Sequence, residues 1–467
     1  MVDRKEKAIL GKTFGEVSKS IAKLTRLKSE NIYNSEESRS NENIEDIEIL
    51  PEYLEAKKLI EDGEHLIFVT GGAGTGKSTF VRWLANEFDG NTLICAPTGI
   101  AALTIGGKTI HSLCRFPPSW IVRDEIKPVT KSLASKAKLL IIDEVSMVNA
   151  NLLDSMNVFF KINRNNKSPF GGISVVMVGD LFQLPPIVTS STKPLFDKIY
   201  DSPKFFSAKL IEKSSVQSIE LTKAFRQVDQ EFVDLLKKIR EGNDLERALE
   251  ELNSKCKITN DPPEGAVWLA PRHVDVDRVN SSRLSKLVGK KKNYEGSIVG
   301  KFKENQLPVP ISVDLKVGAQ VILANNTKQW VNGTVAIVTK MLEDRIQVSL
   351  VEDDKKRIHE VSKYTWVQYD YKFNEKTEMI EKIKIGEYTQ IPVILAWAMT
   401  IHKSQGLTID KVHLDLGTGA FETGQTYVAL SRCRSLKNLT LSKEVKSEDI
   451  KVDPESSAFY KILREGN

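Results

Sequence analysis

Residues 66–88 read LIFVTGGAGTGKSTFVRWLANEF and indicate the class of fold to which this chain of 467 residues belongs. An apolar strand pattern, Leu66–Thr70, runs directly into the loop GGAGTGKS, and the helical pattern of TFVRWLANEF follows. The loop fits G-x-x-x-x-G-K-S in the strand–loop–helix setting of a phosphate-binding loop. Its glycines let backbone N–H groups turn toward a phosphate, and the helix N-terminus favours negative charge there.

The loop therefore predicts a site for ATP. Lys77 is expected to reach the β- and γ-phosphates, and the Ser78 hydroxyl to hold Mg²⁺. The residues predicted to contact the nucleotide are Gly71, Gly72, Ala73, Gly74, Thr75, Gly76, Lys77, Ser78 and Thr79, with Gly406 from later in the chain. The competing interpretation is a glycine-rich turn without function, which explains neither the strand nor the helix beside the loop.

The composition is that of a folded protein with more than one domain. Hydrophobic residues make up 40% and charged residues 28% of a chain too long for one core. No apolar run approaches the ~20 residues that span a membrane. The four cysteines are scattered, which argues against a zinc site or disulfide framework and for a reducing compartment. The net charge of +5 permits nucleic-acid binding in a local groove without arguing for it.

Apolar runs of strand length recur along the chain. They are Leu66–Thr70, Thr92–Pro97, Leu139–Asp143 and Ile173–Asp180, followed later by Val267–Pro271, Val393–Thr400 and Val412–Leu416. Continuous apolar strands between helices are typical of parallel sheets covered on both faces, so we predict an α/β fold with two parallel sheets. Between them, from about Gly296 to Gln390, short β-rich pieces divided by turns predict a small inserted β-barrel.

These patterns give a domain division. We predict a polar extension at residues 1–48, a first α/β domain at 49–215, a second at 216–295 and 391–467, and the barrel at 296–390. The first half of the extension is rich in lysine, which suits either a solvated arm or an extra contact to nucleic acid.

An acidic pair ends the third apolar run, LLIIDEVSM, residues 139–147. Asp143 is predicted to hold Mg²⁺, partly through water, and Glu144 to act as the general base on the attacking water. The structural alternative is that Asp143 caps a helix. A phosphate-binding loop in the same chain favours the functional interpretation.

The run VGDLFQLPPI, residues 178–187, follows a buried strand pattern with a polar Gln183 and two prolines that stop the strand. Ligands of open α/β sheets bind at that end of the strands. Gln183 is predicted to touch the γ-phosphate and to report hydrolysis to the neighbouring surface. This run indicates a motor that couples a triphosphate to movement along a nucleic acid strand.

Two arginines are candidates to stabilise charge on the transferred phosphoryl group. Arg226 lies in LTKAFRQ and Arg432 in TYVALSRCR, with Arg434 as a less certain neighbour. Taken alone, each arginine would more often form a surface ion pair.

In chain order the motifs are GGAGTGKST, APTGIAA, TIHS, IIDEVSM, GDLFQLPPI, LTKAFRQ, TIHKSQGLTID and TYVALSR. This series resembles the Pif-one family of DNA helicases, in superfamily one, branch B, over residues 50–441. RecD-type and phage Dda-type helicases are the nearest alternatives. The resemblance implies two RecA-like domains with ATP between them, a β-barrel insertion in the second and a wedge near residues 113–137, where FPPSW would offer an apolar tip. The family's upstream glutamine, which reads adenine, is replaced by Tyr53, which would stack on a base instead.

The resemblance also implies a groove for single-stranded DNA. Small hydroxyls, backbone N–H groups and histidines suit phosphate contacts without base readout. The residues predicted to contact DNA are Thr98, Gly99, Thr109, His111, His402, Lys403 and Ser404. Candidate stacking aromatics are Trp330, Trp366 and Trp397, although Trp397 also fits a core strand.

The expected activity is that of an ATP- and Mg²⁺-dependent 5′→3′ DNA helicase. Its expected partners are single-stranded DNA, single-strand–duplex junctions and G-quadruplexes, with RNA–DNA hybrids as a further substrate and no membrane. The resemblance implies roles in repair, recombination and telomere maintenance. We expect a monomer, in the cytoplasm of a bacterial or phage host or in the nucleus or mitochondrion of a eukaryote. The alternatives are a nucleic-acid-stimulated ATPase that remodels protein–DNA complexes without useful unwinding, and an inactive binding module.

Overall fold

A six-stranded parallel sheet forms around the strand that precedes the phosphate-binding loop, in the order β3-β2-β4-β5-β1-β6. Its strands are β1 (Leu66–Gly71), β2 (Thr92–Ala96), β3 (Lys108–Thr109), β4 (Leu139–Ile142), β5 (Ser174–Gly179) and β6 (Gln217–Leu221). The central strands β1, β4 and β5 are buried at every residue, as their apolar sequences require. The computed structural model describes residues 48–88, 91–117, 119–129, 133–227, 229–302, 307–330, 332–351, 353, 355–374 and 379–465.

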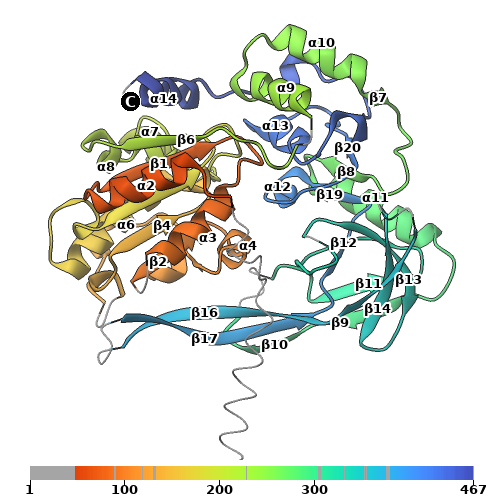
Figure 1. The fold of residues 1–467 in the computed structure, drawn as a ribbon, viewed down its shortest axis with the longest axis horizontal. Coiled ribbons are helices and arrows are strands. Elements are labelled where there is room, and N and C mark those ends of the chain that lie inside the picture. The colour runs from red at the N-terminus through yellow and green to blue at the C-terminus, as the bar shows by residue number, and fades with distance from the viewer. Residues whose placement is uncertain are drawn as a thin grey trace, which may run out of the picture. The chain divides into compact units, whose positions relative to one another are not determined.

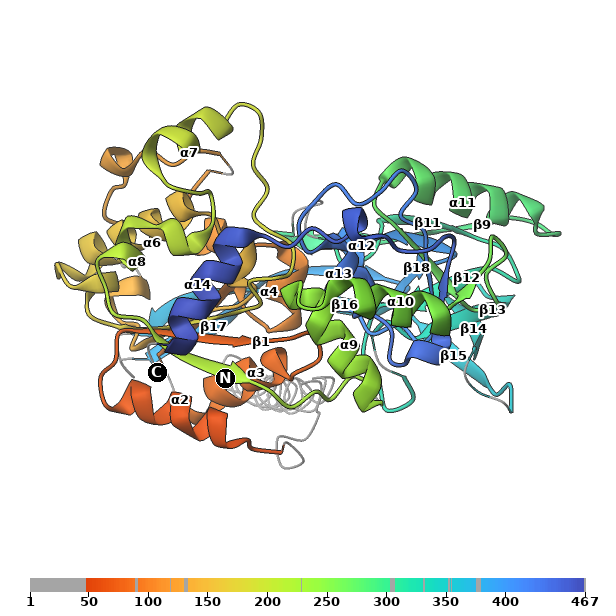
Figure 2. The ribbon, with the colours of Figure 1, turned by 90° about the horizontal axis from the view of Figure 1, so that it is seen from above.

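Helices cover this sheet on both faces (Figure 1). They are α2 (Pro51–Glu61), α3 (Lys77–Glu87), α4 (Gly99–Thr104), α5 (Ile110–Cys114), α6 (Ala150–Arg164), α7 (Lys193–Ile199), α8 (Lys209–Glu212) and, from the end of the chain, α14 (Pro454–Glu465). Figure 2 shows α14 lying among the elements of this sheet. We call the six-stranded sheet with these helices the first lobe.

A second parallel sheet, in the order β19-β8-β20-β21-β7, has a hydrophobic core of its own. Its strands are β7 (Lys257–Ile258), β8 (Val267–Ala270), β19 (Ala398–Thr400), β20 (Val412–Leu414) and β21 (Leu439–Leu441). The accompanying helices are α9 (Gln230–Glu241), α10 (Leu245–Lys255), α11 (His273–Lys286), α12 (Ile401–Ser404) and α13 (Gln425–Leu430). We call this sheet with these helices the second lobe. The two parallel sheets confirm the predicted α/β fold class.

Antiparallel strands occupy the region between β8 and β19. They are β9 (Lys292–Glu295), β10 (Ser297–Gly300), β11 (Ser312–Leu315), β12 (Gln320–Leu323), β13 (Val335–Met341), β14 (Arg345–Leu350), β15 (Ile358–Ser362), β16 (Tyr364–Asn374), β17 (Met379–Gln390) and β18 (Val393–Leu395). They form sheets in the orders β15-β14-β13-β12-β18, β11-β9 and β10-β17-β16. In Figure 1 the long hairpin β16–β17 extends from the other strands as an arm beneath the first lobe.

The strand partners move three predicted domain boundaries. Strand β6 was predicted to open the second domain, but it pairs with β1 in the first sheet. Strand β9 pairs with β11, and β18 with β12, so the antiparallel region extends beyond residues 296–390 on both sides. Helix α14 packs on the first core through Tyr460 and Leu463, although its sequence position suggested the second lobe. The predicted boundaries were placed where the pattern of apolar and polar residues changes along the chain, and such changes do not show which strands pair.

The predicted wedge segment is attached to the first core. Trp120 of FPPSW packs edge-on against Phe196 of α7, with 5.0 Å between ring centroids, and Phe116 packs against Phe159. Arg123 forms an ion pair of 2.8 Å with the buried Asp154. Within the described part of FPPSW, the aromatic rings are therefore packing residues rather than a free apolar tip; Pro118 lies outside the described residues.

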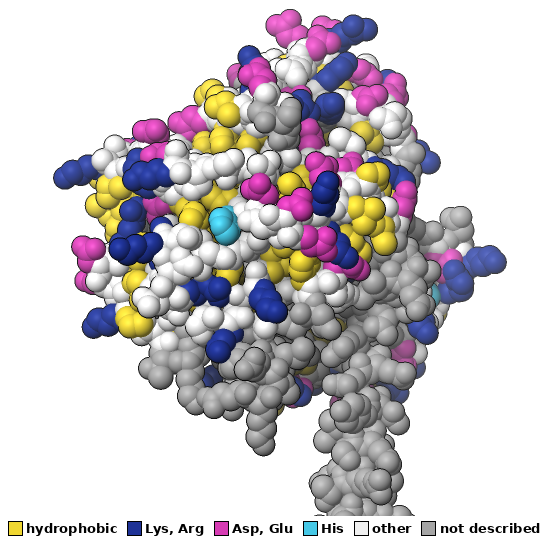
Figure 3. All heavy atoms as spheres, turned by 60° about the vertical axis from the view of Figure 1, so that its left-hand side comes forward, with side chains coloured by type: hydrophobic (Ala, Val, Ile, Leu, Met, Phe, Trp, Pro, Cys, Tyr) yellow, Lys and Arg dark blue, Asp and Glu magenta, His cyan; other side chains and the backbone are white. Residues whose placement is uncertain are grey.

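Three further predictions concern the whole chain. Residues 1–47, the predicted polar extension, lie outside the described residues. None of the helices that the structure describes is long and apolar enough to cross a membrane. All four cysteines are buried and free. Figure 3 shows Lys and Arg side chains spread over the face of the first lobe rather than gathered into one field.

Candidate nucleotide site and nucleic-acid interface

The phosphate-binding loop is closed by bonds from the Lys77 side chain to the loop's own carbonyls. The Lys77 ammonium group donates to the carbonyls of Gly71 and Gly72, at 2.9 Å each, and α3 begins at Lys77. Gly74 and Gly76 both have φ of +83°, which side chains other than glycine adopt only with strain. Burial lowers the pKa of Lys77 despite the nearby charges of Asp180 and Glu144. A phosphate group bound in the loop would favour the charged ammonium form and so oppose the effect of burial on this pKa.

The segment after β6 packs directly against the loop. The Phe225 N–H donates to the Gly74 carbonyl at 2.8 Å, and a Cβ at Gly74 would lie 2.6 Å from the Cβ of Arg226. The Phe225 ring lies beside Gly76 and is 47% exposed, which leaves it free to stack on a nucleotide base.

The prediction that Tyr53 stacks on a base is wrong. Tyr53 is 1% exposed, its ring packs between Phe80 and Trp83, and its hydroxyl donates to the Gly76 carbonyl at 3.3 Å. Tyr53 is therefore a core residue that supports the start of α3. Phe225, which the sequence did not single out, has the exposure that Tyr53 lacks.

The acidic pair lies at the end of β4, as predicted. Asp143 is buried, and its carboxylate accepts the Glu144 N–H at 2.9 Å. Burial, followed by the charge of Glu144, raises the pKa of Asp143 to about 7. Glu144 itself has φ of +50°, a strained backbone conformation of the kind that functional sites retain.

The residues present fit a Mg²⁺ ion that arrives with a nucleotide. Asp143 supplies a carboxylate and Ser78 an exposed hydroxyl, both oxygen ligands of the kind that this ion prefers. A divalent cation would also offset the repulsion that raises the pKa of Asp143. No group of three or more His, Cys, Asp or Glu suited to a metal occurs among the described residues.

Gln183 lies between the two lobes. Its Nε2 donates to Asp180 at 3.1 Å, while its Oε1 accepts from Gln405 of the second lobe at 3.5 Å. The same Gln405 amide donates to the Glu144 carboxylate at 3.1 Å. Gln405 therefore joins the predicted general base to the predicted sensor of hydrolysis, and the two lobes meet at the nucleotide site.

The two predicted arginine fingers differ in their surroundings. Arg226 lies against the loop and donates to the Ser431 carbonyl at 3.3 Å. Arg432 is 1% exposed and donates to groups of its own lobe, among them the carbonyls of Val428 at 2.9 Å and Leu407 at 3.3 Å. Burial, followed by the charge of Arg432, lowers the pKa of Arg226 to about 9.

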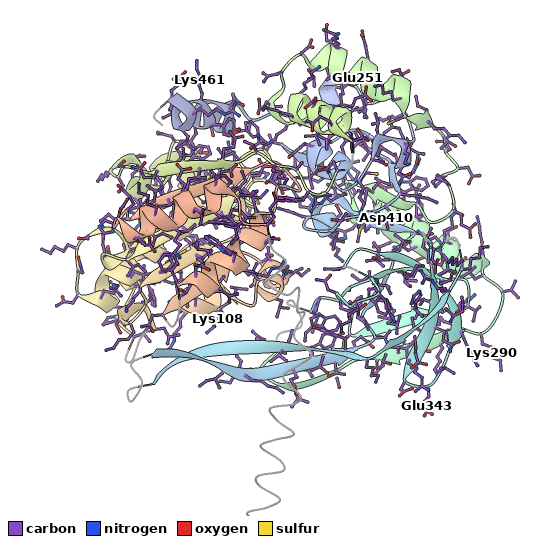
Figure 4. All side chains as sticks on the ribbon, viewed as in Figure 1. Lys108, Glu251, Lys290, Glu343, Asp410 and Lys461 are labelled. Carbon is purple, nitrogen blue, oxygen red and sulfur yellow. The ribbon has the colours of Figure 1, made fainter. Side chains whose placement is uncertain are left out.

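In this arrangement Arg226 borders the nucleotide loop, whereas Arg432 would have to leave its carbonyl partners to reach it. Arg434, the uncertain neighbour, forms an ion pair with Asp410 at 3.3 Å, as its alternative interpretation expected. Figure 4 shows Asp410 within the second lobe.

Three residues of this site were missed from the sequence. Asp180, Arg240 and Tyr427 form a buried cluster in which Arg240 contacts Asp180 at 2.9 Å and the Tyr427 hydroxyl donates to Asp180 at 3.2 Å. Tyr427 also accepts the Ala73 N–H of the phosphate-binding loop at 2.8 Å. Arg240 lies on an amphipathic helix where an arginine reads as a surface residue, so no sequence signal marked it.

The predicted DNA-contact threonines begin short helices. The hydroxyls of Thr98 and Thr109 accept backbone N–H groups of Ala101 and Ser112, at 3.2 Å each. These caps fix where APTGIAA and TIHS turn at the ends of β2 and β3. Each hydroxyl still has its own hydrogen to donate to a phosphate. His111, on α5, is half-buried.

The antiparallel region lies against the segments that begin at Thr98 and Thr109. Gly99 and Thr109 line a small pocket together with Phe302 and Gln368 from the region of β10 and β16. In Figure 4, Lys108 lies on the side of the first lobe that faces the β16–β17 arm. DNA that used these residues would share the space with the arm.

On the second lobe, His402 contributes to an exposed aromatic and cationic cluster. The His402 ring stacks on the ring of Phe421, with 6.4 Å between centroids, and Phe421 is 48% exposed. The Arg272 guanidinium lies 5.9 Å from the centroid of the Phe421 ring. Burial, followed by the charge of His273, lowers the pKa of His402. Lys403 is exposed beside it. Phe421 was missed because GTGAFETG reads as a plain loop.

Four other predicted DNA contacts are wrong or weakened. Ser404 is buried, and its hydroxyl donates to the Ile401 carbonyl at 2.8 Å. Trp330 is 8% exposed, Trp366 stacks on the buried Tyr388, and Trp397 packs on the core of the antiparallel region. These side chains pack against their neighbours, whereas Phe421 lies on a loop and is exposed. Gly406 is exposed, with φ of +82°, and its predicted nucleotide contact stays a prediction.

In the lysine run 290–292, Lys290 and Lys291 are exposed, and strand β9 begins at Lys292. Lys291 pairs with Asp314 at 2.7 Å, and Lys292 donates to the Leu342 carbonyl. Lys290 points away from the molecule in Figure 4.

Two RecA-like sheets with a phosphate-binding loop on one and arginines on the other define a P-loop motor of the helicase class. A model of PIF1-like helicases matches residues 44–249, and a second helicase model matches residues 324–465. The Pif1 helicase of Bdellovibrio bacteriovorus is 33% identical over 436 residues, covering 90% of this chain and 93% of that protein. The chain therefore belongs to the PIF1 helicase family.

Other relatives agree. Human PIF1 is 32% identical and matches 86% of this chain, which spans 62% of the human protein's length. The crystal structure of a Bacteroides Pif1 with ADP-AlF4 superposes with a TM-score of 0.83 at 34% identity, covering 90% of this chain and 98% of that one. The ssDNA-bound form of the Bacteroides protein gives a TM-score of 0.65 at the same identity, covering 90% and 99%. The chain as a whole thus superposes better on the ADP-AlF4 form, and on the unliganded form with a TM-score of 0.81, than on the ssDNA-bound form.

Proposed function

We propose that this protein is an ATP-dependent DNA helicase that moves 5′→3′ along single-stranded DNA and separates duplex ahead of it. The observation that carries the proposal is the junction at the nucleotide site. Glu144 and Gln183 of the first lobe both bond to Gln405 of the second, next to the motif that contains His402 and Lys403. A change at the γ-phosphate therefore acts on the same short segment that is predicted to hold the strand.

The site's residues divide the hydrolysis step between them. Lys77 would bind the β- and γ-phosphates, and Asp143 and Ser78 would hold a Mg²⁺ ion, which supplies charge neutralisation at the phosphates. Glu144 would orient and deprotonate the attacking water, and Arg226 would stabilise charge on the transferred group. The Gln405 amide donates to the Glu144 carboxylate at 3.1 Å, so the second lobe would help to orient the proposed base.

Movement would follow from closing and opening of the cleft. The first lobe offers the helix starts at Thr98 and Thr109, and the second offers His402, Lys403 and Phe421, so each lobe has its own contact to the strand. Contacts to phosphates, with one stacking ring, imply little sequence preference and binding that weakens with salt. The relatives support this proposal, since a Bacteroides Pif1 was crystallised bound to ssDNA.

One experiment tests activity and direction together. A duplex with only a 5′ single-stranded tail is expected to be unwound with ATP and Mg²⁺, and a duplex with only a 3′ tail is not. Preference for the 3′ tail would overturn the direction. Hydrolysis stimulated by single strands without displaced strand would favour a remodelling ATPase instead. G-quadruplexes, RNA–DNA hybrids, the monomeric state, the compartment and the roles in repair, recombination and telomeres stay predictions from the resemblance.

A further inference from the structure

A buried carboxylate stands three residues before Gln183. Asp180 is 0% exposed, just after β5, and its carboxylate accepts hydrogen bonds from four groups. Its Oδ1 accepts from the Arg240 Nε at 3.0 Å and from the Phe182 N–H at 3.2 Å. Its Oδ2 accepts from the Gln183 amide at 3.1 Å and from the Tyr427 hydroxyl at 3.2 Å. Burial alone would raise the pKa of Asp180, but the charges of Arg240 and Lys77 outweigh it and lower that pKa.

The two partners of Asp180 that are distant in sequence, Arg240 and Tyr427, belong to the second lobe. Arg240 is on α9, whose apolar residues pack in the second core, and it is 4% exposed. Tyr427 is on α13 and its ring belongs to the same core. A buried ion pair gives little stability over a well-packed apolar pair. Folding alone therefore gives little reason to place a carboxylate and a guanidinium at this junction.

The cluster also reaches the phosphate-binding loop. The Tyr427 hydroxyl uses both of its roles, since it accepts the Ala73 N–H at 2.8 Å and donates to Asp180. One oxygen atom thus ties the nucleotide loop to the carboxylate that holds Gln183.

An ionised carboxylate can only accept hydrogen bonds, whereas an amide has a donor end and an acceptor end. Asp180 therefore binds the NH₂ end of Gln183 and directs its carbonyl oxygen toward Gln405 and the cleft, where that oxygen accepts at 3.5 Å. Without this constraint the amide could turn over and present NH₂ to the cleft.

We propose that Tyr427 and Arg240 are positioning residues that act through Asp180 to fix the orientation of the Gln183 amide relative to the phosphate-binding loop. The inference rests on the proposed role of Gln183 at the γ-phosphate. Tyr427 transmits movement of the loop at Ala73, and Arg240 transmits movement of α9, so both lobes act on one side chain.

The test is Tyr427→Phe, which removes only the bridging hydroxyl and keeps the buried ring. We expect the kcat of ssDNA-stimulated ATP hydrolysis to fall about tenfold, with KM for ATP changed by less than about twofold. The matched control is Tyr294→Phe. Tyr294 is buried, like Tyr427, but its hydroxyl donates to the Leu342 carbonyl at 2.7 Å within the antiparallel region. Its kcat is expected to stay within about twofold of the parent, with a melting temperature like that of Tyr427→Phe.

A double variant separates positioning from packing. If Tyr427 acts through Gln183, Tyr427→Phe combined with Gln183→Ala hydrolyses ATP no more slowly than Gln183→Ala alone. Additive losses, or a Tyr427→Phe kcat equal to that of Tyr294→Phe while Gln183→Ala is impaired, would overturn the inference. Full turnover by Gln183→Ala would overturn the proposed role of Gln183 itself. Arg240→Met would leave Asp180 buried without its cation, so the tyrosine variants carry the test even if that protein fails to fold.

Discussion

The phosphate-binding loop and the cluster around Asp180 are neighbours built in opposite ways. The loop closes through residues 71–78, with Lys77 donating to carbonyls five and six residues before it. Asp180 instead gathers Arg240 and Tyr427, whose bonds to it span 60 and 247 residues of sequence. The bonds that Lys77 makes within the loop are local, whereas the cluster forms only when both lobes are folded and in contact. The comparison teaches that binding of phosphate is local chemistry here, while its communication to the second lobe depends on the tertiary fold.

The largest expected effect comes from the local side of this comparison. Lys77→Ala or Glu144→Gln should lower ATP turnover by about 100-fold or more, because each removes a group acting at the reacting phosphate. Binding of single-stranded DNA, measured by fluorescence anisotropy without nucleotide, should stay close to that of the parent. Lys57→Ala, which removes an ion pair with Glu87 on the surface, is the control. Equal loss of hydrolysis and DNA binding would count against these roles.

Gly74→Ala should damage the loop through its contact with the next segment. The new Cβ would lie 2.6 Å from Arg226 and would impose φ of +83° on alanine, so we expect a higher KM for ATP and a lower melting temperature. Gly63→Ala is the matched control, because Gly63 has φ of +86° with no atom within 4 Å of a built Cβ. The control should show only the backbone strain, about 1–2 kcal/mol. Equal melting temperatures for the two variants would mean that the contact with Arg226 is not tight.

Substituting two exposed aromatic rings should affect nucleotide binding and DNA binding separately. Phe421→Ala is expected to weaken binding of single-stranded DNA by about tenfold, as for loss of one stacked base, with KM for ATP unchanged. Phe225→Ala should do the reverse, raising KM for ATP and leaving nucleotide-free DNA binding alone. Steady-state hydrolysis and anisotropy on both variants check the crossed pattern. If both variants lost the same function, one of the two ring assignments would be wrong.

The smallest expected effect is a pH dependence within the second core. Burial lowers the pKa of His413 to about 4, from an ordinary value near 6.5, and its Nδ1 pairs with Thr440 at 3.0 Å. As pH falls, His413 is protonated in the unfolded chain at a higher pH than in the folded protein. The stability that the neutral buried ring contributes is therefore complete above about pH 6.5 and is lost as pH falls toward 4. His413→Phe should therefore reduce the loss of urea stability between pH 7 and 5. An unchanged pH profile would assign that loss to other groups.

Much of the site could be predicted because its signals are local. The strand before Gly71, the acidic pair after β4 and Gln183 after β5 all lie at strand ends, and parallel strands bring those ends to one edge. The arginines show where such reasoning stops. Arg226 borders the loop as expected, but Arg432 donates to carbonyls of its own lobe, which no motif reveals. Tyr53 failed for a related reason, since its spacing gave a position along the chain but not the packing of Phe80 and Trp83 around it.

The sequence by itself determined the fold class, the phosphate-binding loop and the family, because each depends on consecutive residues whose period, glycines and charges act within one strand, loop or helix. Only the tertiary structure decided that β6 and α14 complete the first lobe, that Trp330 and Ser404 are buried, and that Phe421 is exposed. It also decided that Asp180 meets Arg240 and Tyr427. These outcomes depend on which surfaces exclude water together, and burial of a side chain is a property of its neighbours in space rather than of its neighbours in sequence.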